Sequence, residues 1–185
     1  MITVVYAPKR KMMQALEVLS CAQTDKKVLL LEYDDLAIRL RGEGLGISVV
    51  SDPVKSESFS EMMNLFVQTM FPNEGLFQMM SLEGASKSRF VSEIREVGGF
   101  NEYLKEPYWV FEDLNSRIEL LLPGRSLNSD GNPFIQSEDI FDADIARNQF
   151  TLLWQIPLDV VEKDYRDYIR GHFKWSEAFN EKHIS

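Results

Sequence analysis

Cysteine and histidine are almost absent from this chain, and their scarcity argues against several kinds of site. The 185 residues hold one cysteine, Cys21, and two histidines, His172 and His183. A single cysteine cannot form a disulfide within the chain, which is typical of proteins in a reducing compartment. Both histidines lie near the C-terminal end, far along the chain from Cys21. We therefore expect no thiol nucleophile, no histidine-based acid–base centre and no zinc site.

Long apolar runs and catalytic motifs are missing as well. No stretch approaches the roughly 20 apolar residues that a bilayer-spanning helix needs. The opening residues, MITVVYAPKRK, run from apolar to charged, which is the reverse of a secretory signal. The sequence has no GxSxG, HExxH, CxxC or glycine-rich dinucleotide motif. These absences predict a cytoplasmic protein that does not enter a membrane and give no sign of a familiar hydrolase or dehydrogenase.

Basic residues are fewer than acidic residues in this chain. The chain has 20 lysines and arginines against 29 aspartates and glutamates, for a formal net charge of -9. Nucleic-acid binders draw their affinity from basic residues that displace counterions, so general binding to a nucleic-acid backbone is not expected, although a local basic patch is compatible with this balance. An acidic surface serves solubility, and it also suits a protein that binds basic partners.

Strand and helix patterns alternate through the first hundred residues. Lys27–Asp35 (KVLLLEYDD) carries the clearest buried-strand signal, and we expect it at the centre of the sheet. With the β-branched run at residues 2–7 and the amphipathic segment at 12–22 it forms a βαβ unit with parallel strands. The same patterns predict strands at 46–50 and 76–82, one or two helical turns at 36–40, and helices from Ser56 or Ser58 to Phe71 and over 87–97. This order predicts an α/β fold with a partly parallel central sheet flanked by helices.

The pattern changes after Phe100. Two short β-type runs, Tyr108–Phe111 and Ile118–Leu122, flank a polar stretch and predict a β-hairpin. Residues 123–133 are rich in turn formers, and helices are expected beyond Ser137, with Phe150–Ile156 open between helix and strand. The length favours a single domain over residues 1–185. Its parts would be an α/β core at 1–100, a hairpin and loop at 101–135, and a helical C-terminal part at 136–185.

Acidic side chains follow two of the predicted strands. Glu32, Asp34 and Asp35 end one strand, and Asp52 follows the next. Ligands of open α/β sheets bind beyond the carboxyl ends of the strands, where several carboxylates could hold Mg²⁺. The structural alternative is that Asp34 or Asp35 caps the following helix and Asp52-Pro53 forms a turn.

A second candidate site is the stretch Ser86-Lys87-Ser88, predicted to open a helix. Free backbone N–H groups at a helix start, together with a lysine, can bind phosphate. The P-loop pattern GxxxxGK[ST] is not fulfilled, since Leu82 and Ser86 stand at its glycine positions. Helix capping by Ser86 explains the same residues without a ligand.

Within residues 1–35, the run ITVVYA followed by a helix and by KVLLLEYDD resembles the opening of MinD/ParA-type P-loop ATPases. That family has a glycine-rich phosphate loop where this chain has Lys9-Arg10-Lys11, so the ATP-binding element does not carry over. The paired acids of Lys27–Asp35 also resemble the first strand of a response-regulator receiver domain, whose later acceptor and lysine positions are not recognisable here. No functional residue transfers from either family, and the basic turn is either solvated or a contact for phosphate or an acidic partner.

The C-terminal region interleaves aromatic and basic residues. The aromatic candidates for partner binding are Tyr165, Tyr168, Phe173 and Trp175. They alternate with Lys163, Arg166, Arg170, His172 and Lys174. Such a helix can pack its rings on the sheet, present them to a protein partner, or stack them on single-stranded nucleic acid.

Three functions remain open from the sequence. The first is a non-catalytic interaction or regulatory protein of a bacterium, phage or other mobile element, which binds another protein and needs no cofactor or metal. The second is an enzyme acting on a nucleotide or phosphorylated substrate, with Mg²⁺ held by the acidic strand ends and Lys87 on a phosphate. The third is a nucleic-acid binder that uses the C-terminal region. The oligomeric state is left open.

Overall fold

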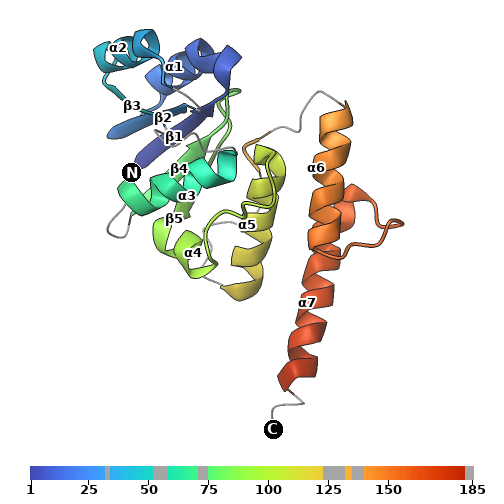
Figure 1. Ribbon diagram of the computed structural model, residues 1–185. Helices are drawn as coiled ribbons and strands as arrows, with labels where there is room; N and C mark the ends of the chain where they lie inside the picture. Colours follow the sequence, from blue (N-terminus) through green and yellow to red (C-terminus); the bar gives the residue numbers. More distant parts are fainter. Residues whose placement is uncertain (32–33, 52–57, 71–74, 123–131, 135–139, 182–185) are drawn as a thin grey trace.

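The computed structural model describes residues 1–31, 34–51, 58–70, 75–122, 132–134 and 140–181, with the backbone alone for residues 9, 70, 140, 141 and 174–181 (Figure 1). Its strands are β1 (Ile2–Ala7), β2 (Lys26–Leu31), β3 (Ile47–Ser51), β4 (Leu76–Met80) and β5 (Ser86–Phe90). Its α-helices are α1 (Met12–Cys21), α2 (Leu36–Gly44), α3 (Phe59–Met70), α4 (Val91–Glu96), α5 (Pro107–Leu121), α6 (Ile140–Leu153) and α7 (Tyr165–Glu181). Short 3₁₀ turns, η1 (Lys9–Lys11) and η2 (Glu162–Asp164), precede α1 and α7. The α/β fold class predicted from the sequence is confirmed.

The five strands form one sheet in the order β3-β2-β1-β4-β5. β1 runs parallel to β2 and to β4, β2 runs parallel to β3, and β5 is antiparallel to β4. The predicted parallel pair of β1 and β2 is confirmed, but the strand at the centre of the sheet is β1 and not the segment beginning at Lys27. Val4 of β1 pairs with Val28 on one side and with Met79 on the other. The second pairing spans a long stretch of sequence, so no local pattern predicts it.

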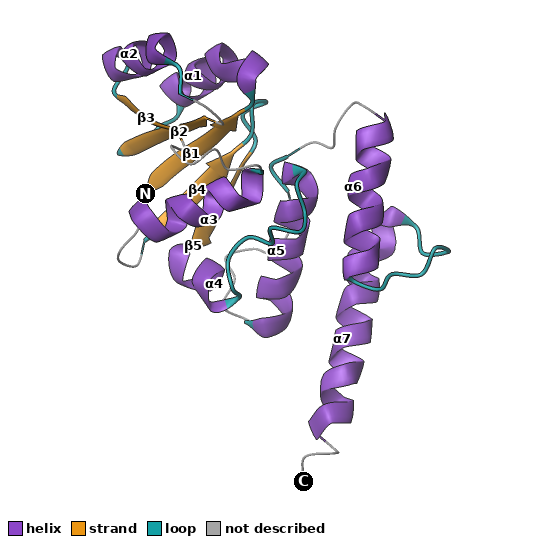
Figure 2. Cartoon of the chain, viewed as in Figure 1, coloured by secondary structure: helices purple, strands orange, loops and turns teal. Residues whose placement is uncertain are grey.

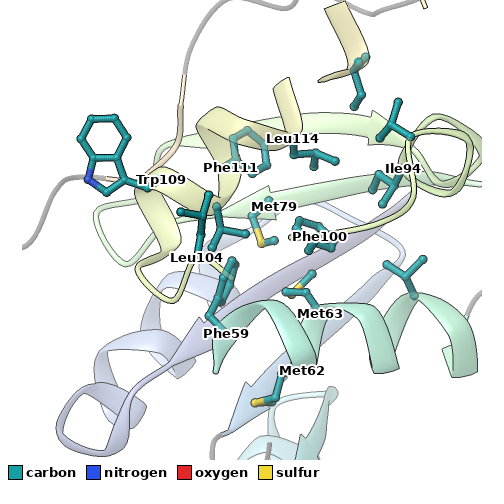
Figure 3. Close-up of a cluster of buried hydrophobic side chains, with 14 of the residues drawn as sticks. Phe59, Met62, Met63, Met79, Ile94, Phe100, Leu104, Trp109, Phe111 and Leu114 are labelled. Carbon is teal, nitrogen blue, oxygen red and sulfur yellow. The ribbon is translucent and has the colours of Figure 1, made fainter. Parts of the chain in front are cut away.

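Helices cover both faces of the sheet (Figure 2). Helices α1 and α2 pack on one face, where Leu16 and Leu19 meet Leu29 of β2. Helices α3, α4 and α5 pack on the other face and form a larger core (Figure 3). The side chains labelled in that view include Phe59, Met63, Met79, Phe100, Phe111 and Leu114, and all of these are buried.

Helix α5 stands where the sequence predicted a β-hairpin, so that prediction is wrong. Glu106 caps the helix by accepting a hydrogen bond from the Trp109 backbone N–H at 3.2 Å, and Pro107 occupies its first turn. Proline is favoured there because its missing N–H is not needed. Most of α5 is buried, including Trp109 and Phe111. A helix that is buried on nearly all sides has no amphipathic stripe. Its β-branched and aromatic residues then form a sequence pattern that is typical of strands.

The hairpin of this fold lies earlier in the chain. β4 and β5 pair around a turn that contains Gly84, whose φ of 83° is in the left-handed region that favours glycine. Strand β5 takes up the first residues of the predicted helix over 87–97, and α4 keeps only the part from Val91. The end of α4 at Glu96 is close to the predicted end at residue 97, and Gly98 and Gly99, which follow its C-cap Val97, both have positive φ.

Helices α6 and α7 pack on the side of α5 that faces away from the sheet (Figure 1). Residues 150–153 are helical, which settles the question left open for Phe150–Ile156, and α6 ends before Gln155, whose φ is 51°. The ring of Phe150 lies 4.8 Å from that of Trp109 in α5. In the described part of the chain, no helix combines the length and apolar character that crossing a bilayer demands.

Gly42 allows α2 to lie close against β3. We expect Gly42→Ala to lower the free energy of unfolding. A Cβ at Gly42 would meet Val49 Cγ2 at 2.4 Å and the Ile47 carbonyl oxygen at 3.3 Å. The expected loss in free energy of unfolding is about 1–3 kcal/mol, the usual cost of an overpacked core. Urea unfolding followed by circular dichroism measures it.

Gly44→Ala is the matched control, because it changes the same helix at a position with nothing within 4 Å of an added Cβ. It should leave stability unchanged or raise it by up to about 1 kcal/mol, since alanine favours helix. Equal effects of the two substitutions would contradict the close packing of α2 on β3.

Candidate functional site

The acidic residues after β2 that the structure describes, Asp34 and Asp35, both accept hydrogen bonds from neighbouring residues. Asp34 accepts hydrogen bonds from Arg39 at 2.6 Å and from Ser51 at 3.3 Å. The Arg39 hydrogen bond is the main reason that the pKa of the Asp34 carboxyl lies below its usual value. Asp35 caps α2 by accepting a hydrogen bond from the Ile38 N–H at 3.0 Å. Capping by Asp35, the structural alternative considered from the sequence, therefore holds.

Glu32 and Asp52 lie outside the described residues, so their place relative to Asp34 stays a prediction. Within the ranges that the structure describes, no group of three or more histidine, cysteine, aspartate or glutamate side chains could hold a metal ion.

Ser86, Lys87 and Ser88 lie in strand β5 and not at the start of a helix, so the reason for expecting a phosphate site there is wrong. Lys87 is paired with Met79 of β4. Between β5 and β2 lie β4 and β1, which puts the two strands three spacings of about 4.8 Å apart, or roughly 14 Å. The strand that carries Lys87 and the strand that precedes Asp34 are therefore not neighbours in the sheet, and a site shared by these two side chains stays a prediction.

The aromatic residues of the C-terminal region pack mainly inward. Tyr165 is 9% exposed, and its ring is stacked on Phe150 with centroids 6.2 Å apart. Tyr168 and Phe173 are partly buried against the same core. The side chain of Trp175 lies outside the described residues. The rings are therefore packed, as in the first alternative, but against α5 and α6 and not on the sheet. This packing leaves less aromatic surface for a partner.

Two of the basic residues of this region, Arg166 and Arg170, are paired with carboxylates. Arg166 donates two hydrogen bonds to Glu112, each 2.7 Å long. Arg170 pairs with Glu119 and, at 3.0 Å, with Asp167. Guanidinium groups neutralised in this way have less to offer a phosphate backbone, so the geometry weakens the nucleic-acid hypothesis.

A polar line along α5 is the feature that the sequence interpretation missed. Its members Glu112, Asp113, Asn115 and Ser116 are all buried. The signal is the run of charged and amide residues between YWVF and IELLL, which in the predicted β-hairpin would be the polar stretch between its strands. Buried polar groups need hydrogen-bond partners, and most of these partners come from distant parts of the chain.

Asp113 is the most enclosed carboxylate on this line, with 1% of its side chain exposed. It pairs with Arg117 at 2.6 Å and accepts a hydrogen bond from the Trp154 indole N–H at 3.1 Å. Burial raises the pKa of the Asp113 carboxyl, and Arg117 and Trp154 act in the opposite direction. Asp113 therefore links α5 to the end of α6.

An apolar groove of about 280 Å³ opens beside this pair. We call it the leucine groove. It is lined by Leu120, Leu121, Leu153, Trp154 and Phe173, with Asn101, Asp113 and Arg117 as its polar members. Leu121 is 56% exposed and Leu153 is 37% exposed. The groove thus offers accessible apolar surface from three helices.

A larger cavity, of about 510 Å³, lies along α5 as well; we call it the aromatic cavity. Its rings are Tyr108 and Trp109 from α5, Phe150 from α6 and Tyr165 from α7. Its polar members include Glu112, Asn132, Lys163 and Arg166. The two hollows share no lining residue.

Comparison with known proteins identified no relative of the chain. No protein-family model matches the chain, and no curated protein matches it. Inference about function therefore rests on the geometry of the two hollows and on charge.

Proposed function

We propose that the chain is a non-catalytic interaction protein that binds another protein through the leucine groove. The observation that carries the proposal is the exposure of Leu121 and Leu153 beside a groove whose polar members are already paired. Exposed apolar side chains around a concave surface are typical of protein-binding sites. A regulatory role in the cytoplasm of a bacterium, or of a bacterium that carries a phage, is part of the same proposal.

The expected partner element is an amphipathic helix with basic residues beside its apolar face. Helices dock their apolar side chains into grooves between other helices, which suits the space between α5, α6 and α7. The net charge of -9 favours a partner of opposite sign. Inside the groove the carboxylate of Asp113 is paired with Arg117, so the apolar contacts would supply affinity and the outer charges would supply orientation.

The test is capture of a partner from a cell extract by the immobilised chain. We expect Leu121→Asp with Leu153→Asp to reduce the recovery of a retained protein at least tenfold, because a buried unpaired carboxylate costs more than about 1.4 kcal/mol. Both positions are accessible, so the fold should survive, which circular dichroism checks. Raising the salt concentration should lower recovery as well, since the partner is expected to be basic.

Leu40→Asp is the matched control. Leu40 is 60% exposed on α2, which packs on the opposite face of the sheet from α5. This variant should retain the same protein as the wild type. A partner that is retained equally by the leucine-groove variant would overturn the proposal.

A further inference from the structure

Helix α2 carries leucines on the side where a surface helix normally carries polar residues. Ile38 and Gly42 are buried on its sheet side, whereas Leu36 is 69% exposed and Leu40 is 60% exposed. The two leucines lie about half a turn around the helix from Ile38. Figure 1 shows α2 at the outer end of the molecule, with α1 beside it. Large apolar side chains on the outer side of such a helix indicate a contact surface.

The exposed row continues to a glycine. Leu36, Leu40 and Gly44 follow one another at intervals of four residues, so they lie along one side of α2. Gly44 is exposed, and a Cβ added there would meet nothing within 4 Å. The row therefore has a large side chain at one end, another in the middle and open space at the other end.

Such a row is complementary to itself when two helices run antiparallel. A two-fold axis at Leu40 places Leu40 of one copy against Leu40 of the second copy and Leu36 over Gly44. Each copy then fills the space that the other leaves open, as close packing between helices requires. A parallel arrangement would put Leu36 on Leu36 and leave both glycine ends empty.

The charges beside the row agree with the antiparallel arrangement. Arg39 pairs with Asp34 at 2.6 Å, and Glu43 is exposed, with no hydrogen bond or ion pair to a residue in the described part of the chain. At a rise of about 1.5 Å per residue, Glu43 of one copy would lie within one turn of Arg39 of the second. Within α2 Arg39 and Arg41 stand against Glu43 alone, so this helix does not share the acidic excess behind the net charge of -9. Two copies are therefore repelled less here than their net charges alone would suggest.

From these observations we infer that a second copy of the chain binds along α2, with the two helices antiparallel and Leu40 at the centre of the contact. One helix of 9 residues offers less than the roughly 800 Å² per partner of stable interfaces, so the dimer is weak and reversible, with a dissociation constant on the order of 100 μM. Helix α2 packs on the opposite face of the sheet from α5, which lines the leucine groove. The inference therefore does not depend on the protein-binding proposal.

Sedimentation velocity of the full chain measures the association. We expect the average mass to rise from that of one chain toward that of two between about 10 μM and 1 mM. Leu36→Asp with Leu40→Asp should weaken the association at least about tenfold, because it places carboxylates in an apolar contact. Circular dichroism checks that this variant is folded.

Two control variants exclude other surfaces. Leu152→Asp, at a side chain that is 72% exposed on α6, and Leu121→Asp with Leu153→Asp in the leucine groove should both leave the association unchanged. A chain that stays monomeric up to about 1 mM would overturn the inference. So would an association that Leu36→Asp with Leu40→Asp leaves as strong as in the wild type.

Disulfide cross-linking tests the orientation of the two copies. The chain has one cysteine, Cys21, so a Cys21→Ser background carries a single thiol after each further substitution. With Leu40→Cys the two-fold arrangement brings two thiols together, and a covalent dimer should form on oxidation in air. With Leu36→Cys the two thiols would lie about 12 Å apart along the helices, whereas a mixture of Leu36→Cys and Gly44→Cys chains should cross-link. Cross-linking of Leu36→Cys chains with one another as efficiently as Leu40→Cys chains would contradict the antiparallel contact.

Discussion

Replacing Arg89 with alanine should lower the free energy of unfolding by about 3–5 kcal/mol, the range for opening a large cavity or breaking a buried polar contact. Arg89 of β5 is fully buried. Its guanidinium donates to Asn115 Oδ1 in α5 and, at 2.9 Å, to the Ser88 carbonyl, and it lies 5.8 Å from the centre of the Phe111 ring. Truncation removes a long side chain and leaves Asn115 without this donor. Urea unfolding measures the loss.

Arg89→Met separates packing from charge. Methionine fills most of the same space but carries no charge, and burial already disfavours the charge, as the lowered pKa of the Arg89 guanidinium indicates. We expect this variant to lose only about 1–2 kcal/mol, mainly from the hydrogen bond that Arg89 no longer donates to Asn115 Oδ1. If methionine were as damaging as alanine, the stabilising role of Arg89 would be electrostatic and the packing argument would be wrong.

The second large effect is expected for Phe150→Ala, with a loss of about 3–5 kcal/mol in the free energy of unfolding. Phe150 is 2% exposed and its ring contacts those of Trp109, Trp154 and Tyr165. This contact joins α6 and α7 to α5. The buried cluster is continuous from the sheet to α7, so the whole chain should unfold in one cooperative step, as the predicted single domain requires.

Amide hydrogen exchange tests that cooperativity. In Phe150→Ala the slowest amides of β1 and of α6 should lose protection together. Loss of protection confined to α6 and α7 would show that these two helices unfold independently of the sheet. The control is Leu152→Ala in the same helix, where the side chain is 72% exposed and the change should stay within about 0.5 kcal/mol.

The sequence predicted the first half of the fold because its signals are local. Strands β1 to β4 are short apolar runs, and α1 and α3 have apolar residues at helical spacing, with Ser58 Oγ accepting a hydrogen bond from the Glu61 N–H at the start of α3. Asp35 was likewise recognisable as a helix cap. Each of these features depends on neighbours within a few residues.

The predictions for two elements, β5 and α5, are wrong because the structure of these elements depends on partners elsewhere in the chain. The segment from Ser86 to Phe90 has little strand character, and pairing with β4 makes it a strand. Helix α5 faces the sheet on one side and α6 and α7 on the other. Because it is buried on both sides, its apolar residues do not recur at the helical spacing that marks an amphipathic helix. Glu106 and Pro107 are a local signal for its start, but the β-type runs that follow them favour strands.

The two hollows could not be read from the sequence for a similar reason. Trp109 and Tyr165 are far apart in the chain, as are Leu121 and Phe173, and only the packing of α5 against α6 and α7 brings them together. The sequence named Tyr165 and Phe173 as candidate contact residues. It did not show that they line different sites.

The central position of β1 has a consequence during synthesis of the chain. β1 can pair with β2 soon after both leave the ribosome, but its other edge waits for β4, some 45 residues after the end of β2. At about 5–20 residues per second this edge stays open for roughly 2–9 s. An unpaired edge rich in valine can pair with a strand of another nascent chain. Between synthesis of β2 and synthesis of β4, therefore, one edge of β1 is open to pairing with a neighbouring nascent chain.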